Sequence, residues 1–153
     1  MATAMLDLWN LSKHYLLDTP LNNYANIGRW ALHMLDGTFV HDSIKASAAK
    51  PYEGAVGWFG HYAIGVAFAF WLLAGWGLKW LNKPTLLPAM IVGVVTVAIP
   101  FLLMYPGMGM GFFGLNAANP SAVIMKAMTS HIVFGITLYL AGLVVYKIKG
   151  TIL

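Results

Sequence analysis

The stretch GAVGWFGHYAIGVAFAFWLLAGWGL, residues Gly54–Leu78, decides the fold of this chain. His61 is its only ionisable side chain, and the stretch is longer than the roughly 20 apolar residues that a helix needs to cross a bilayer. Lys79, Trp80 and Lys83 follow at its end, and Trp and Lys side chains favour the membrane interface. The stretch therefore predicts a transmembrane helix.

The sequence that follows is equally poor in charge. No acidic residue comes after Glu53, and residues 84–125 carry neither a charged side chain nor a histidine. Over the whole chain 59% of residues are hydrophobic and only 9% are charged, whereas an ordinary globular domain is roughly 25% charged. The polar helix faces of a water-soluble domain are missing, so we predict an all-α integral membrane helical bundle.

Two further spans are expected. One runs over about Leu86–Tyr105, where Pro100 predicts a kink, and it ends at Pro106 and Gly107. The other runs from about Ser121 to Tyr146. The segment PGMGMGFFGLNAANPS between them, residues 106–121, is too rich in glycine for a stable helix and predicts a loop.

The first 53 residues predict two shorter helices within one membrane-embedded domain that covers residues 1–153, with the transmembrane core in residues 54–153. Met1–Leu17 has a helical rhythm of apolar residues but is too short to span alone. An amphipathic helix over residues 20–36 would lie at the interface, with Thr19 as its cap and Gly37 at its end. Residues 37–51 then form a polar loop.

Lysine placement predicts the orientation. With three crossings, the Lys79–Lys83 loop and the C-terminal tail with Lys147 and Lys149 lie on the same side. Both are short, basic and free of acids, so we place them in the cytoplasm and the protein in a bacterial inner membrane. Residues 20–53 and 106–121 then face the other side.

Charge and cysteine content limit the function. The net charge is +4, but the lysines are scattered singly and form no basic patch, so no nucleic-acid partner is expected. The lipid bilayer is the expected partner, and a second copy of the chain or another membrane protein remains open. The absence of cysteine excludes thiolate metal sites and cysteine nucleophiles.

Several segments in order resemble one known family. They are NYANIGRWALHMLDGTFVHDSI, GWFGHYAIGVAFAFWLLAGWGLKW, KPTLLPAMIVGVVTVAIPF, the PGMGMG turn and SHIVFGITLYLAG. The chain is similar over nearly its whole length to a bacterial family of small multi-pass membrane proteins known as domain of unknown function number twenty-nine thirty-eight. The resemblance implies the membrane fold. No activity or cofactor is known for that family, so no functional residue is carried over to this chain.

The resemblance also bears on the N-terminus. Members of that family begin with a full transmembrane helix whose second half reads like ATAMLDLW, residues 2–9 here. Met1 then falls at the middle of that helix. We expect either that translation begins upstream, which makes Asp7 an intramembrane carboxylate, or that this first helix is shortened.

His61 and His131 are the leading candidates for a ligand site. Each lies on a stripe of small residues, which include Gly57 and Gly65 around the first and Gly135 after the second. Such stripes let transmembrane helices approach closely, so the two histidine helices are expected to meet. Ionisable groups inside membranes are functional candidates by default, although hydrogen bonding across a helix interface is the favoured interpretation.

Other polar groups give weaker candidates. Asp7, Asn10 and His14 share one helical face and would form a polar seam or an exposed edge. Met104, Met108 and Met110, with the two histidines, suggest a copper site, although methionine is more often a filler of gaps in a core. A loop group could bind a divalent ion or be solvated, and it consists of His33, Asp36, His41 and Asp42. Arg29 beside Trp30 suggests an interface anchor.

These patterns favour a non-enzymatic protein that binds or passes a small solute or ion, or that supports a membrane assembly. The alternative is an intramembrane enzyme or metal-binding protein that uses His61 and His131 with a polar group from the first 53 residues. No complete set of catalytic roles can be assigned, and no cofactor is indicated.

Overall fold

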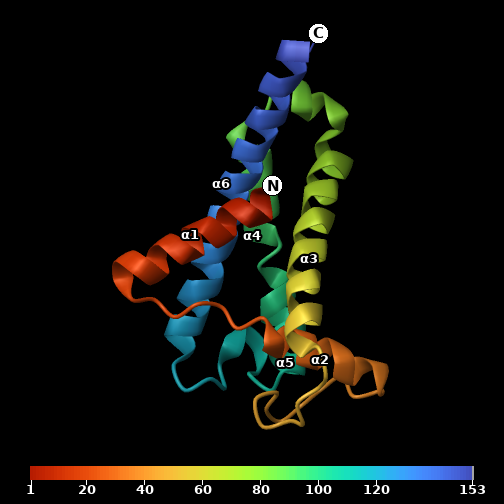
Figure 1. Ribbon diagram of the computed structural model, residues 1–153, viewed down its shortest axis with the longest axis vertical. Helices are drawn as coiled ribbons and strands as arrows, with labels where there is room; N and C mark the ends of the chain where they lie inside the picture. The colour runs from red at the N-terminus through yellow and green to blue at the C-terminus, as the bar shows by residue number, and fades with distance from the viewer. Residues whose placement is uncertain (153) are drawn as a thin grey trace. The chain divides into compact units, whose positions relative to one another are not determined.

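A computed structural model describes residues 1–152 as an all-helical protein, and no strand occurs in that range (Figure 1). The α-helices are α1 (Ala2–Leu17), α2 (Ala25–Leu35), α3 (Glu53–Trp76), α4 (Leu86–Val95), α5 (Tyr105–Gly107) and α6 (Pro120–Ile152). Short 3-10 helices cover Leu78–Asn82 and Phe112–Gly114, and a π-helical segment covers Pro100–Met104. The predicted all-α fold is confirmed.

Three helices are long and apolar enough to cross a membrane. They are Glu53–Trp76, Leu86–Gly107 and Pro120–Thr151. The second contains α4, the π-helical segment and α5. These agree with the three spans expected from the sequence, and the last helix extends past Tyr146 because Lys147 and Lys149 continue it rather than ending it.

The middle of the second long helix is irregular, as Pro100 predicts. α4 ends at Val95, a turn follows at residues 96–97, and π-helical geometry begins at Pro100. Proline has no N–H, so the carbonyl four residues earlier, that of Thr96, receives no helical hydrogen bond from it. The next residue, Phe101, has an N–H group and donates it to Val97 O at 3.2 Å, so the helical hydrogen bonds resume directly after the proline.

The described chain packs as two compact units. Unit 1 contains Met1–Leu21, Ile64–Thr96 and the chain from Met128 onward, and unit 2 contains Asn22–Ala63 and Val97–Ala127. α3 and α6 contribute residues to both units. Each unit has buried apolar side chains of its own.

Unit 1 depends on a close crossing of α4 and α6. A Cβ added to Gly93 would lie 2.7 Å from the Cα of Gly135 and 2.6 Å from the carbonyl oxygen of His131, so only glycine fits there. Phe68 of α3 packs beside the crossing, with its ring centroid 5.9 Å from that of Phe134. Leu72 beside them is 1% exposed. Backbone contact between α4 and α6 therefore forms the centre of this unit.

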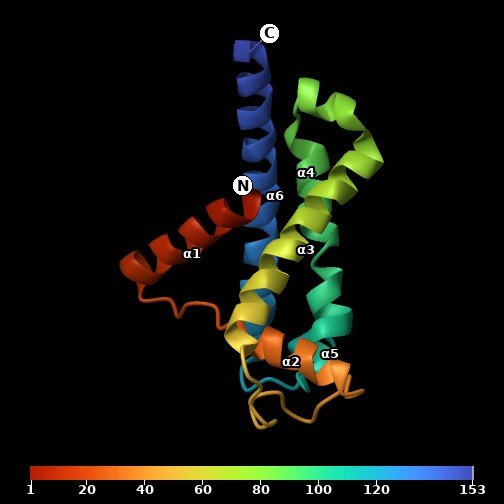
Figure 2. The ribbon, with the colours of Figure 1, turned by 45° about the vertical axis from the view of Figure 1, so that its right-hand side comes forward.

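Helix α1 joins unit 1 by its first two turns. Ala2, Thr3 and Leu6 are buried, and the Thr3 side chain occupies the space that a Cβ of Gly65 would need. The helix then runs away from α6 (Figure 2). Large apolar side chains of its second half stand exposed, among them Tyr15, Leu16 and Leu17.

Unit 2 depends on a second close crossing, in which α2 lies across the first turns of α3 (Figure 1). A Cβ on Gly28 would overlap the carbonyl oxygen of Glu53, and a Cβ on Gly57 would overlap that of Tyr24. Trp30, on the next turn of α2, covers Gly107 and donates from Nε1 to Phe39 O at 2.9 Å. Helix α2 is thereby fixed at backbone distance from α3.

Two local predictions are wrong. Helix α2 begins at Ala25, with Tyr24 as its N-cap, rather than after Thr19. Asn23 Oδ1 accepts the Ala25 N–H at 3.0 Å just before the helix. Pro20 lies in the extended link that follows Asp18, whose left-handed φ of 49° ends α1. The expected end of α2 near Gly37, with its φ of 81°, is confirmed.

The α2–α3 crossing gives the first testable prediction. We expect Gly28→Ala to lower the free energy of unfolding by about 3 kcal/mol, the upper range for overpacking, because its methyl group meets backbone that cannot yield. Gly60→Ala in α3 is the matched control, since nothing lies within 4 Å of its added Cβ and alanine favours a helix. Thermal unfolding in mild detergent measures both, and equal melting temperatures for the two variants would contradict the crossing.

Candidate functional site

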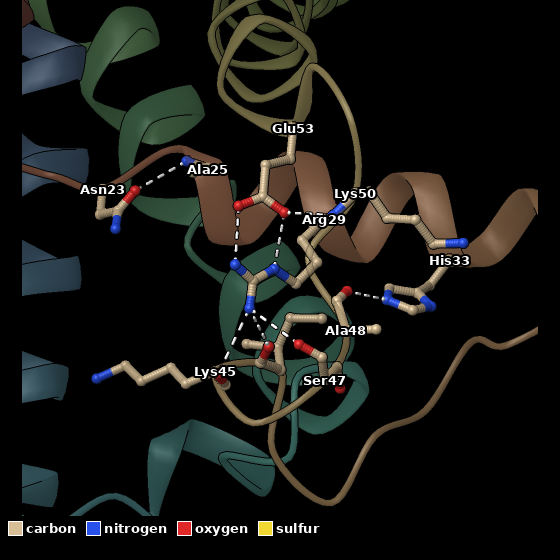
Figure 3. A network of polar contacts seen from close by, with 10 residues as sticks. Asn23, Ala25, Arg29, His33, Lys45, Ser47, Ala48, Lys50 and Glu53 are labelled. Carbon is tan, nitrogen blue, oxygen red and sulfur yellow. Dashed lines mark hydrogen bonds and ion pairs between the residues drawn. The ribbon is translucent and has the colours of Figure 1, made fainter.

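The loop between α2 and α3 is organised by one arginine. Arg29 donates from Nε and one terminal nitrogen to the two oxygens of Glu53, each at 2.8 Å, which forms a bidentate ion pair (Figure 3). Its remaining nitrogen donates to the carbonyl oxygens of Ile44 at 3.2 Å, Lys45 at 3.4 Å and Ser47 at 3.1 Å. The guanidinium thus joins α2, the loop and the first residue of α3, and it serves the fold. The interface-anchor role of Arg29 stays a prediction.

The charges around this pair reinforce it. Glu53 Oε2 also accepts the backbone N–H of Lys50 at 2.9 Å. The hydrogen bond with Glu53 raises the pKa of the Arg29 guanidinium. Nearby, Lys50 donates to the Asp36 carboxylate, and this bond holds the pKa of Asp36 below its ordinary value. Both basic groups are therefore bonded to carboxylates around the loop.

Two histidines of the loop group also hold backbone or side chains in place. His33 Nε2 donates to Ala48 O at 2.9 Å, and the His33 and His41 rings meet edge to face with centroids 4.9 Å apart. Ser47 Oγ donates to Ser43 O, so its 3.1 Å contact with His41 takes Nδ1–H as the donor. The other ring nitrogen of His41, Nε2, is buried and has no partner among the described residues.

The glycine-rich turn packs directly against this loop. His41 N donates to Gly107 O at 3.0 Å, and Ile44 N donates to Met108 O at 3.1 Å. Gly109, with a φ of 85°, lies where any Cβ would overlap the Asp42 carbonyl. Backbone hydrogen bonds therefore join the α2–α3 loop to the glycine-rich turn. These are the two segments that the sequence predicts on one side of the membrane.

A hollow of about 300 Å³ opens where these two segments meet. Its lining contains one carboxylate, one imidazole and one carboxamide, together with apolar side chains and glycines. The lining residues are Val40, His41, Asp42, Pro106, Gly109, Gly111, Phe112 and Asn116. A second hollow of about 310 Å³ on α4 is lined by apolar side chains alone, so the first is the better candidate for a polar ligand.

His61 is placed in unit 2, next to the start of α2. Its Nε2 lies 3.2 Å from Tyr24 Oη, and the two rings stack with centroids 4.2 Å apart. Asn22 Nδ2 also donates to Tyr24 Oη at 3.4 Å, and Trp58 packs against the Tyr24 ring at 4.6 Å. His61 therefore belongs to an aromatic cluster in the N-terminal part of α3.

His131 is placed in unit 1, at the break in the second long helix. Its Nδ1 donates to Gly93 O at 3.1 Å and lies 3.1 Å from Thr96 Oγ1. Thr96, only 1% exposed, donates in turn to the carbonyls of Val92 and Gly93. The imidazole therefore bonds to a carbonyl at the α4–α6 crossing, the arrangement expected of a packing role.

The small-residue stripes around the two histidines do approach other helices at backbone distance, but they meet different partners. Gly57 and Gly65 contact Tyr24 and Thr3, on either side of the α1–α2 link, and Gly135 contacts α4. The expectation that the two histidine helices meet is confirmed, because Phe68 of α3 contacts the rings of His131 and Phe134 of α6. They meet through these aromatic side chains and not through the stripes.

The remaining candidates are divided in the same way. On α1, in unit 1, Asp7 and Asn10 are half-buried, and Asn10 Nδ2 is a buried atom with no partner among residues 1–152. His14 Nδ1 donates to Thr19 O at 3.0 Å and closes the end of α1. In unit 2, Met108 is 6% exposed and packs in the core, and Met104 and Met110 are half-buried. Within the described part of the chain, no three His, Asp or Glu side chains gather as a metal site would require.

Sequence reasoning missed the hollow and the Arg29–Glu53 pair. Both join positions far apart in the chain, and no spacing rule links them. One signal was present: Glu53 is the last acid before an uncharged span, and a carboxylate there needs a basic partner.

These features define an all-helical protein with three helices long and apolar enough to cross a membrane. The chain belongs to the family described as "Protein of unknown function (DUF2938)", whose model matches residues 1–145. Neither the curated proteins nor the solved structures contain a match to it.

The arginine network gives the second prediction. We expect Arg29→Lys to lower the melting temperature by several degrees and to speed tryptic cleavage after Lys45, because lysine keeps the charge but cannot bridge Glu53 and three carbonyls at once. Asp36→Asn removes only an exposed ion pair and should change both readouts little. Equal behaviour of the two variants would show that the guanidinium fork does not hold the loop.

Proposed function

We propose that this is an integral protein of a bacterial cytoplasmic membrane, crossed by the three long apolar helices. Large apolar side chains on these helices stand exposed, including Phe70, Leu87 and Leu103. Hydrocarbon is the solvent that such faces fit, and a helix satisfies its own backbone hydrogen bonds there. In the last turn of α4, before the break near Pro100, Thr96 and His131 bond to the Gly93 carbonyl, as suits a helix end in an apolar surrounding.

We propose further that the Lys79–Lys83 loop and the C-terminal end face the cytoplasm. Lys149 Nζ donates to Asn82 Oδ1 at 3.1 Å, so both basic segments lie at the same end of unit 1. Short lysine-rich segments are retained on the cytoplasmic side. The loop 38–50 and the glycine-rich turn would then face the periplasm.

The proposed activity is non-enzymatic binding of a small polar solute in the hollow between this loop and the glycine-rich turn. The distribution of the polar side chains is the observation that supports this proposal. Arg29, Glu53, His33 and His131 each make bonds that hold the fold. The hollow gathers Asp42 and Asn116, whose side chains make no hydrogen bond within residues 1–152. A pocket with a few convergent polar groups among apolar ones is the usual form of a small-ligand site.

A second candidate function rests on His61. Its contact with Tyr24 Oη pairs a histidine with a polar group from the first 53 residues, as the intramembrane enzyme or metal-binding alternative requires. Metal analysis of the protein purified in mild detergent tests it. A stoichiometric metal ion in the wild type that is lost in His61→Ala and His131→Ala would favour this alternative over the solute-binding proposal.

The topology is tested with fusions. Alkaline phosphatase, which is active only in the periplasm, should be inactive when fused after Leu153 and active when inserted in the loop between Gly37 and Pro51. Green fluorescent protein at the C-terminus, which fluoresces in the cytoplasm, is the complementary control. An active phosphatase at the C-terminus would reverse the proposed orientation.

Solute binding is tested by thermal stabilisation. We expect at least one class in a panel of small amines, carboxylates, sugars and divalent cations to raise the melting temperature in a saturable way, because a ligand of the folded state stabilises it by mass action. Val40→Trp should abolish the shift by filling the hollow. Lys45→Ala, with an exposed side chain in the same loop, should retain it. A shift that survives Val40→Trp would place the ligand elsewhere.

A further inference from the structure

The charge of the hollow limits what it can bind. Among its lining residues Asp42 alone carries a formal charge at neutral pH, and no Lys or Arg contributes to the wall. An anionic solute would therefore meet a carboxylate and no compensating cation. A positively charged group would find the opposite charge at once.

The hydrogen-bonding groups of the lining act in the same direction. The backbone N–H groups of His41, Gly109 and Asn116 already donate to Gly107, Pro106 and Met110 respectively. His41 Nδ1–H is used by Ser47. Asp42, the charged side chain of the lining, is an acceptor only, and the Asn116 carboxamide offers an oxygen acceptor beside its N–H donors. The complementary ligand is a hydrogen-bond donor.

The apolar part of the wall favours a ligand that carries a hydrocarbon group. Val40 and Phe112 are 72% and 60% exposed, so their side chains remain available to a bound molecule. An aromatic ring attracts a cation placed over its face, and aliphatic side chains cover methylene groups. A bare metal ion has no methylene groups for the aliphatic wall to cover, and it also needs more oxygen ligands than one carboxylate and one carboxamide supply.

We propose that this hollow binds a primary ammonium group attached to a short alkyl chain, with Asp42 as the counter-ion and Phe112 beside the cation. The inference rests on the proposed function and names the ligand class of that site. Two sources present this chemistry: a free alkylamine, and the ethanolamine head group of a phospholipid. The hollow is formed by loops at one end of the long helices, which a head group or a free amine could each reach.

The first experiment uses ethanolamine and n-butylammonium as probes, with ethanol and acetate as uncharged and anionic controls. Full-length protein in mild detergent is followed by thermal unfolding and isothermal titration calorimetry. We expect saturable binding of both amines and none of either control. Acetate binding that depends on Asp42 or Phe112 would overturn the proposal and leave solute binding intact.

Matched variants locate the amine. Asp42→Asn keeps the shape of the side chain and removes its charge, and it should weaken amine binding about tenfold, as loss of one charge-assisted hydrogen bond does. Phe112→Leu should weaken it less. Asp18→Asn, at an exposed aspartate in left-handed conformation that asparagine also tolerates, should leave binding unchanged. Equal affinities in Asp42→Asn and Asp18→Asn would overturn the assignment.

Nanodiscs separate the two sources. If the head group is the natural occupant, phosphatidylethanolamine nanodiscs should block n-butylammonium binding, and phosphatidylglycerol nanodiscs should permit it. Equal binding in both lipids assigns the site to a free amine. Stabilisation by Mg²⁺ without any amine effect contradicts the ammonium proposal. If no probe of any class responds to the hollow variants, the solute-binding function fails with it.

Discussion

The ion pair between Arg29 and Glu53 is the interaction on which unit 2 depends. It stands at the first residue of α3, where α2 crosses so closely that Gly28 admits no side chain. The third nitrogen of the guanidinium donates hydrogen bonds to three loop carbonyls, which would otherwise need hydrogen bonds from water. The loop is then rigid enough to receive backbone bonds against the glycine-rich turn, and the hollow forms between them.

The second long helix poses a different problem, because it is broken among apolar side chains. Pro100 withdraws one donor from the helical ladder, and the chain leaves α-helical geometry at residues 96–97. Thr96 and His131 bond to carbonyls next to the break. Such bonds matter more in hydrocarbon than in water, because no solvent replaces them. A histidine inside a span therefore need not signal chemistry, and here its bonds account for its place.

In both units, most of the polar side chains hold the fold together, and few remain for a binding site. Charged and imidazole groups that the sequence marks as candidates are largely used to hold helices and loops, and the exposed Asp42 and Asn116 gather in a hollow formed by loops. This division is common where a rigid scaffold carries binding groups on its connecting segments. The ligand site expected at His61 and His131 stays a prediction.

The sequence by itself determined the helical class, the three long apolar helices and the break at Pro100, because hydropathy and the missing proline N–H act locally and in any context. It could not determine which glycine meets which helix, since a small-residue stripe permits close approach without naming the partner. Nor could it join Arg29 to Glu53, or Asp42 to the turn containing Gly109, because these contacts link distant positions. Only tertiary packing brings such groups together, and the candidate site therefore came from the structure.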